Sequence, residues 1–271
     1  MKSDTSNRFA YIETRLQWGD GLTARDIAET FRLTRQTAQG LIDEYRQHYP
    51  GNLYFDPSVK KQLPGESFSP HHISKDAGHF LDYLRGHELV GYYLDQSEWS
   101  ELSLVDVDRF TRPKLNFSNT RELLASLRNR HSLRVTYRAK TRHLDRDICP
   151  HSIIFASNRY HVRAYCHLSG RFLDLVVSRI DNFRASQEPW VPSSQDGEWN
   201  GYADIVFTVN PSLPHPSVVA IRMDYGLKES ENLTVTCRKA LAFYVRRELL
   251  AIDLKYGMPR WIEVTASSKN T

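Results

Sequence analysis

The apolar positions before residue 50 recur at helical spacing in three short stretches. Phe9, Ile12 and Leu16 lie three to four residues apart, and a glycine-containing turn follows them. A second helix is expected after Thr23 and a third after Thr34, because threonine is a favourable N-cap residue directly before an apolar pattern. The pattern therefore predicts three helices at the start of the chain.

The third predicted helix has an apolar face and a polar first turn. With the helix before it, it forms a helix-turn-helix pattern. Leu53–Phe55 and Val59–Leu63 then have the composition of two strands around the turn Asp56-Pro57-Ser58. A hairpin in this place is a wing, so we expect residues 1–65 to form a winged helix-turn-helix domain.

The residue types in this domain suit DNA. The first turns of a recognition helix reach the base edges, where Arg pairs with guanine and Gln with adenine, and wing lysines can contact phosphates. The candidate DNA-binding residues are Thr23, Thr34, Arg35, Gln36, Thr37, Gln39, Lys60 and Lys61. Residues 1–64 hold nine Lys or Arg and eight Asp or Glu, so the domain carries a charge of only +1. We therefore expect it to bind double-stranded operator DNA as a homodimer on an inverted repeat.

A linker and connecting helices are expected over residues 66–131. Residues 64–74 are rich in Pro, Gly, Ser and His, which is typical of a linker. Residues 109–113 are expected to be extended. Residues 118–131 predict a helix with Ser118 or Asn119 as its cap.

From Leu133 the apolar pattern alternates instead of following a helical period. Ser157-Asn158 and Ser169-Gly170 are turn signals between runs rich in Ile, Val, Tyr and Phe. Short antiparallel strands with tight turns predict a small β-barrel over residues 132–187.

The remaining residues, 188–271, predict a small α+β domain after a linker rich in Pro and Ser. The order is strand, helix, strand, helix. We expect the last helix to turn Phe243, Val245, Leu249 and Ile252 inward. The whole chain is therefore assigned to the α+β class, with a winged helix, a small barrel and a C-terminal extension.

Composition places the protein among ordinary globular chains. It has 271 residues, a net charge of +4 and three cysteines without a CxxC pair, which favours a reducing, cytoplasmic setting. Neither a signal peptide nor an apolar run of membrane-spanning length stands in the sequence, so we expect no membrane partner. Residues 126–184 hold twelve Lys or Arg against four Asp or Glu, so the positive charge gathers on the predicted barrel.

The barrel carries more cationic and aromatic side chains than it can bury. We therefore expect several of them to line a groove, where guanidinium groups beside aromatic rings would bind a phosphate and a stacked base. The ligand expected there is a nucleotide, an oligonucleotide or a single-stranded nucleic acid. The residues behind this expectation are Tyr137, Arg138, Arg146, His151, Arg159, His161, Arg163 and Arg179.

The strings TYR, RDICPHSIIF and NRYHVRAYCHLSGRFLDLVVSRI, in this order, resemble the WYL domain of bacterial transcription regulators. Tyr160-His161-Val162 stands where the family usually has Trp-Tyr-Leu. The resemblance implies an Sm-like or SH3-like barrel, and a subgroup of repressors beside phage-defence islands of the BREX and CBASS type. The ligand-binding residues it implies, together with the cluster above, are Tyr137, Arg138, Arg146, His151, Arg159, Arg163, Tyr165, Ser178 and Arg179.

Enzyme motifs do not support a catalytic function. GxxxxGK[ST], GxGxxG and HExxH are missing from the sequence, and no second Cys/His pair at zinc spacing accompanies Cys149-Pro150-His151. We therefore expect no cofactor, no metal and no catalytic residue. The leading hypothesis is a ligand-responsive, sequence-specific DNA-binding regulator that acts as a repressor. The alternative is an RNA- or nucleotide-processing enzyme that uses the His, Arg and Tyr cluster of the barrel.

Overall fold

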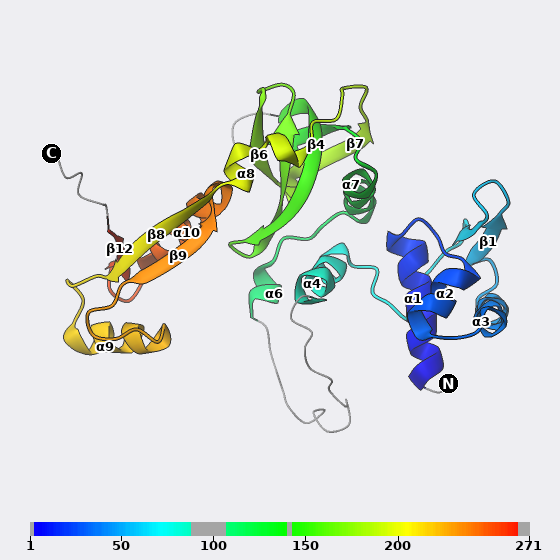
Figure 1. Ribbon diagram of the computed structural model, residues 1–271, viewed down its shortest axis with the longest axis horizontal. Helices are drawn as coiled ribbons and strands as arrows, with labels where there is room; N and C mark the ends of the chain where they lie inside the picture. Colours follow the sequence, from blue (N-terminus) through cyan, green and yellow to red (C-terminus); the bar gives the residue numbers. More distant parts are fainter. Residues whose placement is uncertain (1–2, 88–106, 140–142, 265–271) are drawn as a thin grey trace.

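A computed structural model of the protein describes residues 3–87, 107–139 and 143–264. A winged helix lies at one end of the molecule, a C-terminal α+β unit lies at the other, and a five-stranded sheet lies between them (Figure 1). Within the described ranges, no helix is long and apolar enough to cross a membrane.

The predicted winged helix is confirmed. Its elements are α1 (Ser3–Trp18), α2 (Ala24–Phe31), α3 (Arg35–His48), β1 (Leu53–Asp56) and β2 (Lys61–Pro64). Thr23 and Asp26 form a capping box at α2, and the Thr34 hydroxyl accepts a hydrogen bond from the Thr37 N–H at the start of α3. Gly21 has a φ of 82°, and a Cβ there would lie 2.4 Å from the Gln62 carbonyl oxygen, so a side chain does not fit beside the wing.

The predicted small barrel is a curled antiparallel sheet with the strand order β6-β5-β4-β3-β7. Both tight turns form as expected: Ser157 and Asn158 have positive φ between β4 and β5, and Gly170 has positive φ between β5 and β6. A register shift at His151 bends the long strand β4. The elements are β3 (Leu133–Arg138), β4 (His143–Ala156), β5 (Arg159–Cys166), β6 (Arg171–Val176), the 3-10 turn η1 (Val177–Arg179) and β7 (Ile180–Ala185).

The C-terminal unit is a three-stranded sheet of order β12-β8-β9 with the helices α8, α9 and α10 and a separate β10–β11 hairpin. Two predicted inward positions are wrong: Phe243 and Ile252 are each 66% exposed. The helix ends at Leu249, so Ile252 begins a new strand and leaves the helical face. The elements are η2 (Ser193–Gln195), α8 (Gly197–Asn200), β8 (Tyr202–Val209), α9 (His215–Asp224), β9 (Leu233–Arg238), η3 (Lys239–Leu241), α10 (Ala242–Leu249), β10 (Ile252–Asp253), β11 (Met258–Pro259) and β12 (Trp261–Glu263).

The connecting region holds α4 (Ala77–His87), α6 (Asp108–Thr111) and α7 (Phe117–Asn129). The expected extended stretch at 109–113 is wrong for residues 109–111, because these belong to the helical turn α6, while Arg112 after it is extended. The expected cap of α7 is also wrong: the side chain of Asn116 accepts the hydrogen bond from the Asn119 N–H. The part of the expected connecting helices that falls on residues 88–106 lies outside the described residues.

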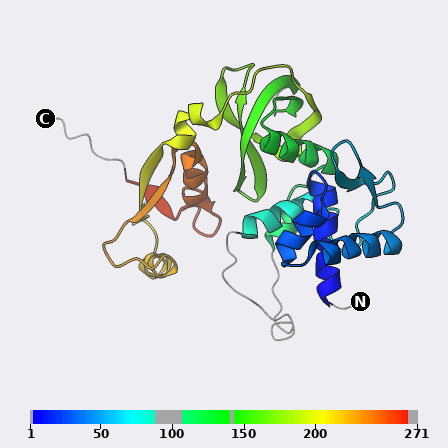
Figure 2. The ribbon, with the colours of Figure 1, turned by 45° about the vertical axis from the view of Figure 1, so that its right-hand side comes forward.

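Helices α1, α4 and α7 meet at Trp18, which is only 3% exposed. The Trp18 ring stacks on Phe80 with 4.6 Å between centroids, and it meets the edge of Phe117 at 5.0 Å. The Arg128 guanidinium donates to the Trp18 carbonyl oxygen at 2.8 Å. Figure 2 shows α4 and α7 beside α1, so the winged helix packs directly against the helices that lead to the barrel.

Helix α4 is in turn fastened to the β4–β5 hairpin through Asp82. Its carboxylate accepts hydrogen bonds from the Tyr160 hydroxyl and from Arg112. The guanidinium of Arg85 lies 3.9 Å from the centre of the Phe155 ring. The winged helix and the barrel are thus joined by packed side chains as well as by the chain itself.

A buried carboxylate orders the predicted linker. Glu13 on α1 is 0% exposed and accepts hydrogen bonds from the Tyr45 hydroxyl at 3.1 Å and from three successive backbone N–H groups. Those N–H groups belong to His71, His72 and Ile73, at 2.8, 2.6 and 3.2 Å. The segment after the wing is therefore held against α1.

We expect Glu13→Gln to lower the free energy of unfolding by about 2 kcal/mol or more, because the amide group brings an N–H₂ toward N–H donors and loses the charge they stabilise. Urea denaturation followed by circular dichroism measures the change. The exposed Glu66→Gln is the matched control, expected to change stability by less than about 0.5 kcal/mol. Equal effects of the two substitutions would contradict the role of Glu13.

Candidate functional site

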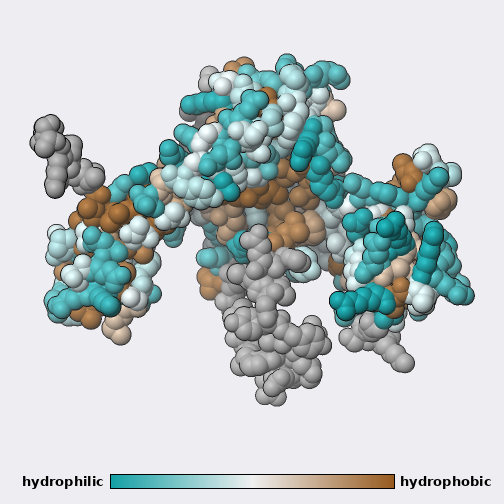
Figure 3. Space-filling view, in the orientation of Figure 1, coloured by the Kyte–Doolittle hydropathy of each residue, from teal (hydrophilic) through white to brown (hydrophobic). Residues whose placement is uncertain are grey.

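The winged helix contains a groove of about 640 Å³ between the start of α3 and the wing. Five of the predicted DNA-binding residues line it. These are Thr23, Arg35, Gln36, Gln39 and Lys60. Asp43 and Phe55 also line it, and sequence reasoning did not select them. The surface of this unit is largely hydrophilic in the view of Figure 3.

The candidate side chains of the groove differ in how much of their hydrogen bonding is already used. Thr34 and Thr37 bond to each other at 2.8 Å. The Gln39 amide donates to Asp43 at 3.2 Å. By contrast, among the described residues no side-chain hydrogen bond or ion pair engages Arg35, Gln36, Lys60 or Lys61. Those four side chains remain available to bases and phosphates.

The predicted ligand residues of the barrel do not converge on one point. One face of β5 carries every second residue of the strand, at positions 159, 161, 163 and 165. Tyr137 and Arg146 lie elsewhere, with the Arg146 guanidinium 5.9 Å from the Tyr137 ring centre. Arg138 forms an ion pair with Asp181. Ser178 is exposed on η1, beside the half-buried Arg179.

The most closely organised part of the cluster surrounds Asp196, just before α8. Its two oxygens accept a bidentate pair of hydrogen bonds from Arg163, from Nε at 2.8 Å and from Nη2 at 3.0 Å. The same carboxylate accepts from His151 Nε2 at 3.2 Å and from the Trp199 N–H at 3.0 Å. The side chains of Arg163, His151 and Asp196 are 5%, 4% and 2% exposed.

Burial and charge set the protonation states of this group. Burial lowers the pKa of His151 below 6.5, against the opposing hydrogen bond to Asp196. Burial alone would raise the pKa of Asp196, but hydrogen bonds from Arg163 and the Trp199 N–H hold it below 3.8. Neutral His151 therefore donates through Nε2 to the carboxylate, and its Nδ1 accepts from the Ser152 hydroxyl at 2.9 Å.

Two further nitrogens of this face are buried without a hydrogen-bond partner in the described part of the chain. They are His161 Nδ1 and Arg159 Nε. His161 is 5% exposed, and burial lowers its pKa. Its ring meets the edge of Tyr244 from α10, at 5.0 Å between centroids. The face of β5 thus contacts the C-terminal unit at two places, around Asp196 and around Tyr244.

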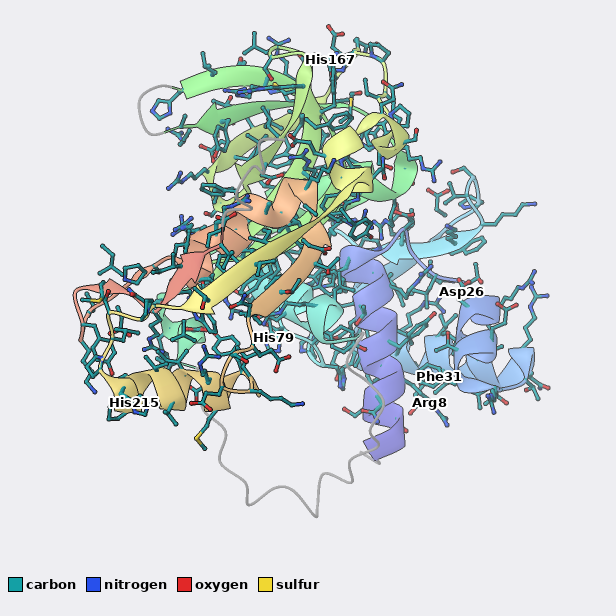
Figure 4. All side chains as sticks on the ribbon, turned by 60° about the vertical axis from the view of Figure 1, so that its left-hand side comes forward. Arg8, Asp26, Phe31, His79, His167 and His215 are labelled. Atoms are coloured by element: carbon teal, nitrogen blue, oxygen red, sulfur yellow. The ribbon has the colours of Figure 1, made fainter. Side chains whose placement is uncertain are left out.

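Cys149 does not pair with His151. Its sulfur lies 3.4 Å from Nε2 of His167, whose Nδ1 is 3.5 Å from Glu188. Figure 4 shows His167 at the end of the barrel farthest from the winged helix. Cys149 is 0% exposed, so a substrate does not reach it. Over the described ranges, no group of three His, Cys, Asp or Glu side chains is placed to hold a metal ion.

Asp196, Glu198 and Trp199 were missed because the sequence places them in a Pro- and Ser-rich linker. The signal available was the string DGEW, in which an Asp precedes a short helix as its N-cap. Nothing in that string indicates its partner, because Arg163 is 33 residues away.

Comparison with protein families assigns three parts of the chain. Residues 4–86 match the winged helix-turn-helix domain of the BrxR transcriptional regulator. Residues 118–185 match the WYL domain, and residues 202–258 match the C-terminal dimerization domain of the BrxR transcriptional regulator.

Curated relatives align along nearly the whole chain. The DNA-binding transcriptional repressor CapW of Escherichia coli (strain KTE188) is 24% identical, covering 97% of this chain and 89% of that protein. CapW of Stenotrophomonas maltophilia is 26% identical over 90% of this chain and 82% of its own length. CapW of Pseudomonas aeruginosa is 26% identical over 89% and 81%.

A solved structure, proteasome accessory factor B/C of Arthrobacter aurescens, aligns with 98% of this chain and 46% of that chain at 13% identity. Its TM-score of 0.26 is too low to support an argument. The three family domains occur in the order in which the structure places a winged helix, a curled five-stranded sheet and a C-terminal α+β unit. The chain is a WYL-domain transcriptional regulator of the subgroup with a BrxR-type winged helix and C-terminal dimerization domain.

Proposed function

We propose that this protein is a ligand-responsive, sequence-specific DNA-binding repressor of a phage-defence operon. The groove between α3 and the wing, where Arg35 and Gln36 have no side-chain partner among the described residues, carries the proposal. The relatives named as DNA-binding transcriptional repressors support it across the full length of the chain.

In this proposal α3 enters the major groove of operator DNA. Arg35 pairs with a guanine and Gln36 with an adenine, since these side chains match the base edges bidentately. Lys60 and Lys61 of the wing contact phosphates. Thr34 and Thr37 stabilise the first turn of α3 through their mutual hydrogen bond, so that the two reading side chains are held in place.

The protein would act as a homodimer on an inverted repeat, with half-sites about 10 base pairs or a multiple apart. The C-terminal unit supports this, because it matches a dimerization domain and exposes large apolar side chains. Leu254 is 100% exposed and Met223 is 75% exposed. Apolar surface on this unit is visible in Figure 3.

The barrel would bind the effector, a nucleotide, an oligonucleotide or a single-stranded nucleic acid, since residues 126–184 hold twelve Lys or Arg against only four Asp or Glu. The effector switches the protein only if it binds the DNA-competent and DNA-incompetent dimers with different affinities. The enzyme alternative has less support, because the imidazole of His151 is 4% exposed and both its nitrogens are engaged.

We expect Arg35→Ala and Gln36→Ala each to weaken binding to the DNA upstream of the protein's own gene by about 1–3 kcal/mol, because each removes a base contact. Gel shifts at fixed salt measure the loss. Arg171→Ala, at the exposed first residue of β6, removes the same charge as Arg35→Ala and should bind the operator normally. Uniform weakening by all three substitutions would contradict base reading by α3.

A second prediction concerns the dimer. Leu254→Asp should raise the dissociation constant of the dimer at least tenfold, because burying a leucine contributes about 1.5–3 kcal/mol and a symmetric interface loses two of them. Sedimentation velocity reports the change. Leu168→Asp is the control, because Leu168 is 61% exposed but lies on the barrel. An unchanged dimer in Leu254→Asp would exclude the β10–β11 hairpin from the interface.

A further inference from the structure

The segment that carries α8 covers the face of the barrel where anion-binding side chains gather. Figure 1 shows α8 at the joint between the five-stranded sheet and the C-terminal unit. It delivers two carboxylates and one aromatic ring to that face, from Asp196, Glu198 and Trp199.

All three side chains contact the basic residues of β4 and β5. Both carboxylate oxygens of Asp196 accept hydrogen bonds from Arg163. A guanidinium binds a phosphate in the same bidentate geometry. Glu198, which is 71% exposed, lies 3.3 Å from Arg163 Nη2. The Trp199 ring lies edge-on to His151, with 5.4 Å between centroids.

The local charge balance depends on this segment. Arg163 faces three carboxylates, because Asp174 on β6 also lies 3.2 Å from Nη1. Two of the three belong to the α8 segment. Without them, the face would keep Arg163 and Arg159 against Asp174, beside the neutral rings of His151 and His161. The face would then bind anions, and the unpartnered His161 Nδ1 and Arg159 Nε would be available to them.

We propose that Asp196, Glu198 and Trp199 form an internal substitute for the effector, in which the carboxylates take the place of two phosphates and the indole that of a base. A phosphate-bearing effector would then displace the segment and bind Arg163 in its place. This proposal rests on the proposed function, since it requires an anionic effector at the barrel.

Displacement would alter the connection between the barrel and the dimerization unit. The α8 segment leads directly into β8 at Tyr202, and the Arg238 guanidinium lies 4.8 Å from the Trp199 ring centre. The remaining contact, between Tyr244 of α10 and Asp174 and His161, would act as the hinge. The effector competes with the α8 segment, which is tethered to the barrel and therefore has a high effective concentration. The apparent affinity of the effector for the protein is then lower than its affinity for a barrel face from which the segment has moved away.

The experiment uses the full-length protein and a 5′-phosphorylated tetrathymidylate as probe, with binding measured by calorimetry. We expect Asp196→Asn to bind the probe about tenfold more tightly than the unaltered protein, because the amide keeps the cap of α8 but loses the charge that competes. Glu198→Gln should strengthen binding less, since Glu198 is mostly exposed. Asp145→Asn, an exposed carboxylate of β4 that accepts from Thr136, is the matched control and should change nothing.

A second measurement follows the segment itself in the unaltered protein. The Trp199 N–H donates to the Asp196 side chain, and the Asn200 and Gly201 N–H groups donate to the backbone carbonyls of Asp196 and Gly197. Hydrogen exchange at these three amides should accelerate when the probe binds. This readout does not depend on whether Asp196→Asn folds.

Equal or weaker probe binding by a folded Asp196→Asn, or no binding at all, would overturn the substitution proposal. So would probe binding that slows exchange at 199–201. Failure of the proposed function gives a different result: the unaltered protein would form no salt-sensitive, sequence-selective complex with its upstream DNA. If the protein binds its upstream DNA in gel shifts but the probe experiments fail, the proposed repressor function stands and only the internal substitute is rejected.

Discussion

The ion pair between Arg163 and Asp196 is the contact on which the arrangement of the C-terminal half depends. Both side chains are almost fully buried, and removing Arg163 would leave the Asp196 carboxylate without a cationic partner, typically a loss of about 3–5 kcal/mol. A buried pair of this kind contributes little net stability against an apolar replacement, because its desolvation cost is large. Its effect is to specify one position: the segment before β8 must lie on the β5 face of the barrel.

The N-terminal half is joined to the barrel by aromatic stacking and hydrogen bonds in place of a buried ion pair. Trp18 packs between α4 and α7, and the Glu13 carboxylate accepts hydrogen bonds from three backbone N–H groups of the segment after the wing. Asp82 then ties α4 to Tyr160 on the barrel. A continuous set of packed contacts therefore runs from the winged helix to β5, whose opposite face meets α8. A change at Arg163 has a physical route to the DNA-reading helix through a strand that both contacts share.

Charge is divided along the molecule in a way that fits this arrangement. The winged helix is nearly neutral, and in the proposed function operator recognition depends on a few side chains that have no partner among the described residues and are placed by caps and by the wing. The barrel is strongly basic, but its innermost guanidinium is neutralised by carboxylates from a neighbouring segment. In the mechanism proposed above, the winged helix holds DNA through a few placed side chains, and the anion site of the barrel stays closed until a competing anion binds.

The local pattern of apolar, capping and turn residues was enough to predict most of the helices and strands. Helical spacing with Thr caps predicted α2 and α3, and alternation with Ser157-Asn158 predicted the β4–β5 hairpin, because these signals act within a few residues. Local pattern misplaced two helix ends: α10 ends before Ile252, which begins a strand, and Asn116 caps α7 in place of Ser118 or Asn119. The residues of the barrel cluster were named from the sequence, but their partners were not. Arg163 meets Asp196 only because two chain segments 33 residues apart fold onto the same strand face, and hydropathy does not encode which buried charges will be paired.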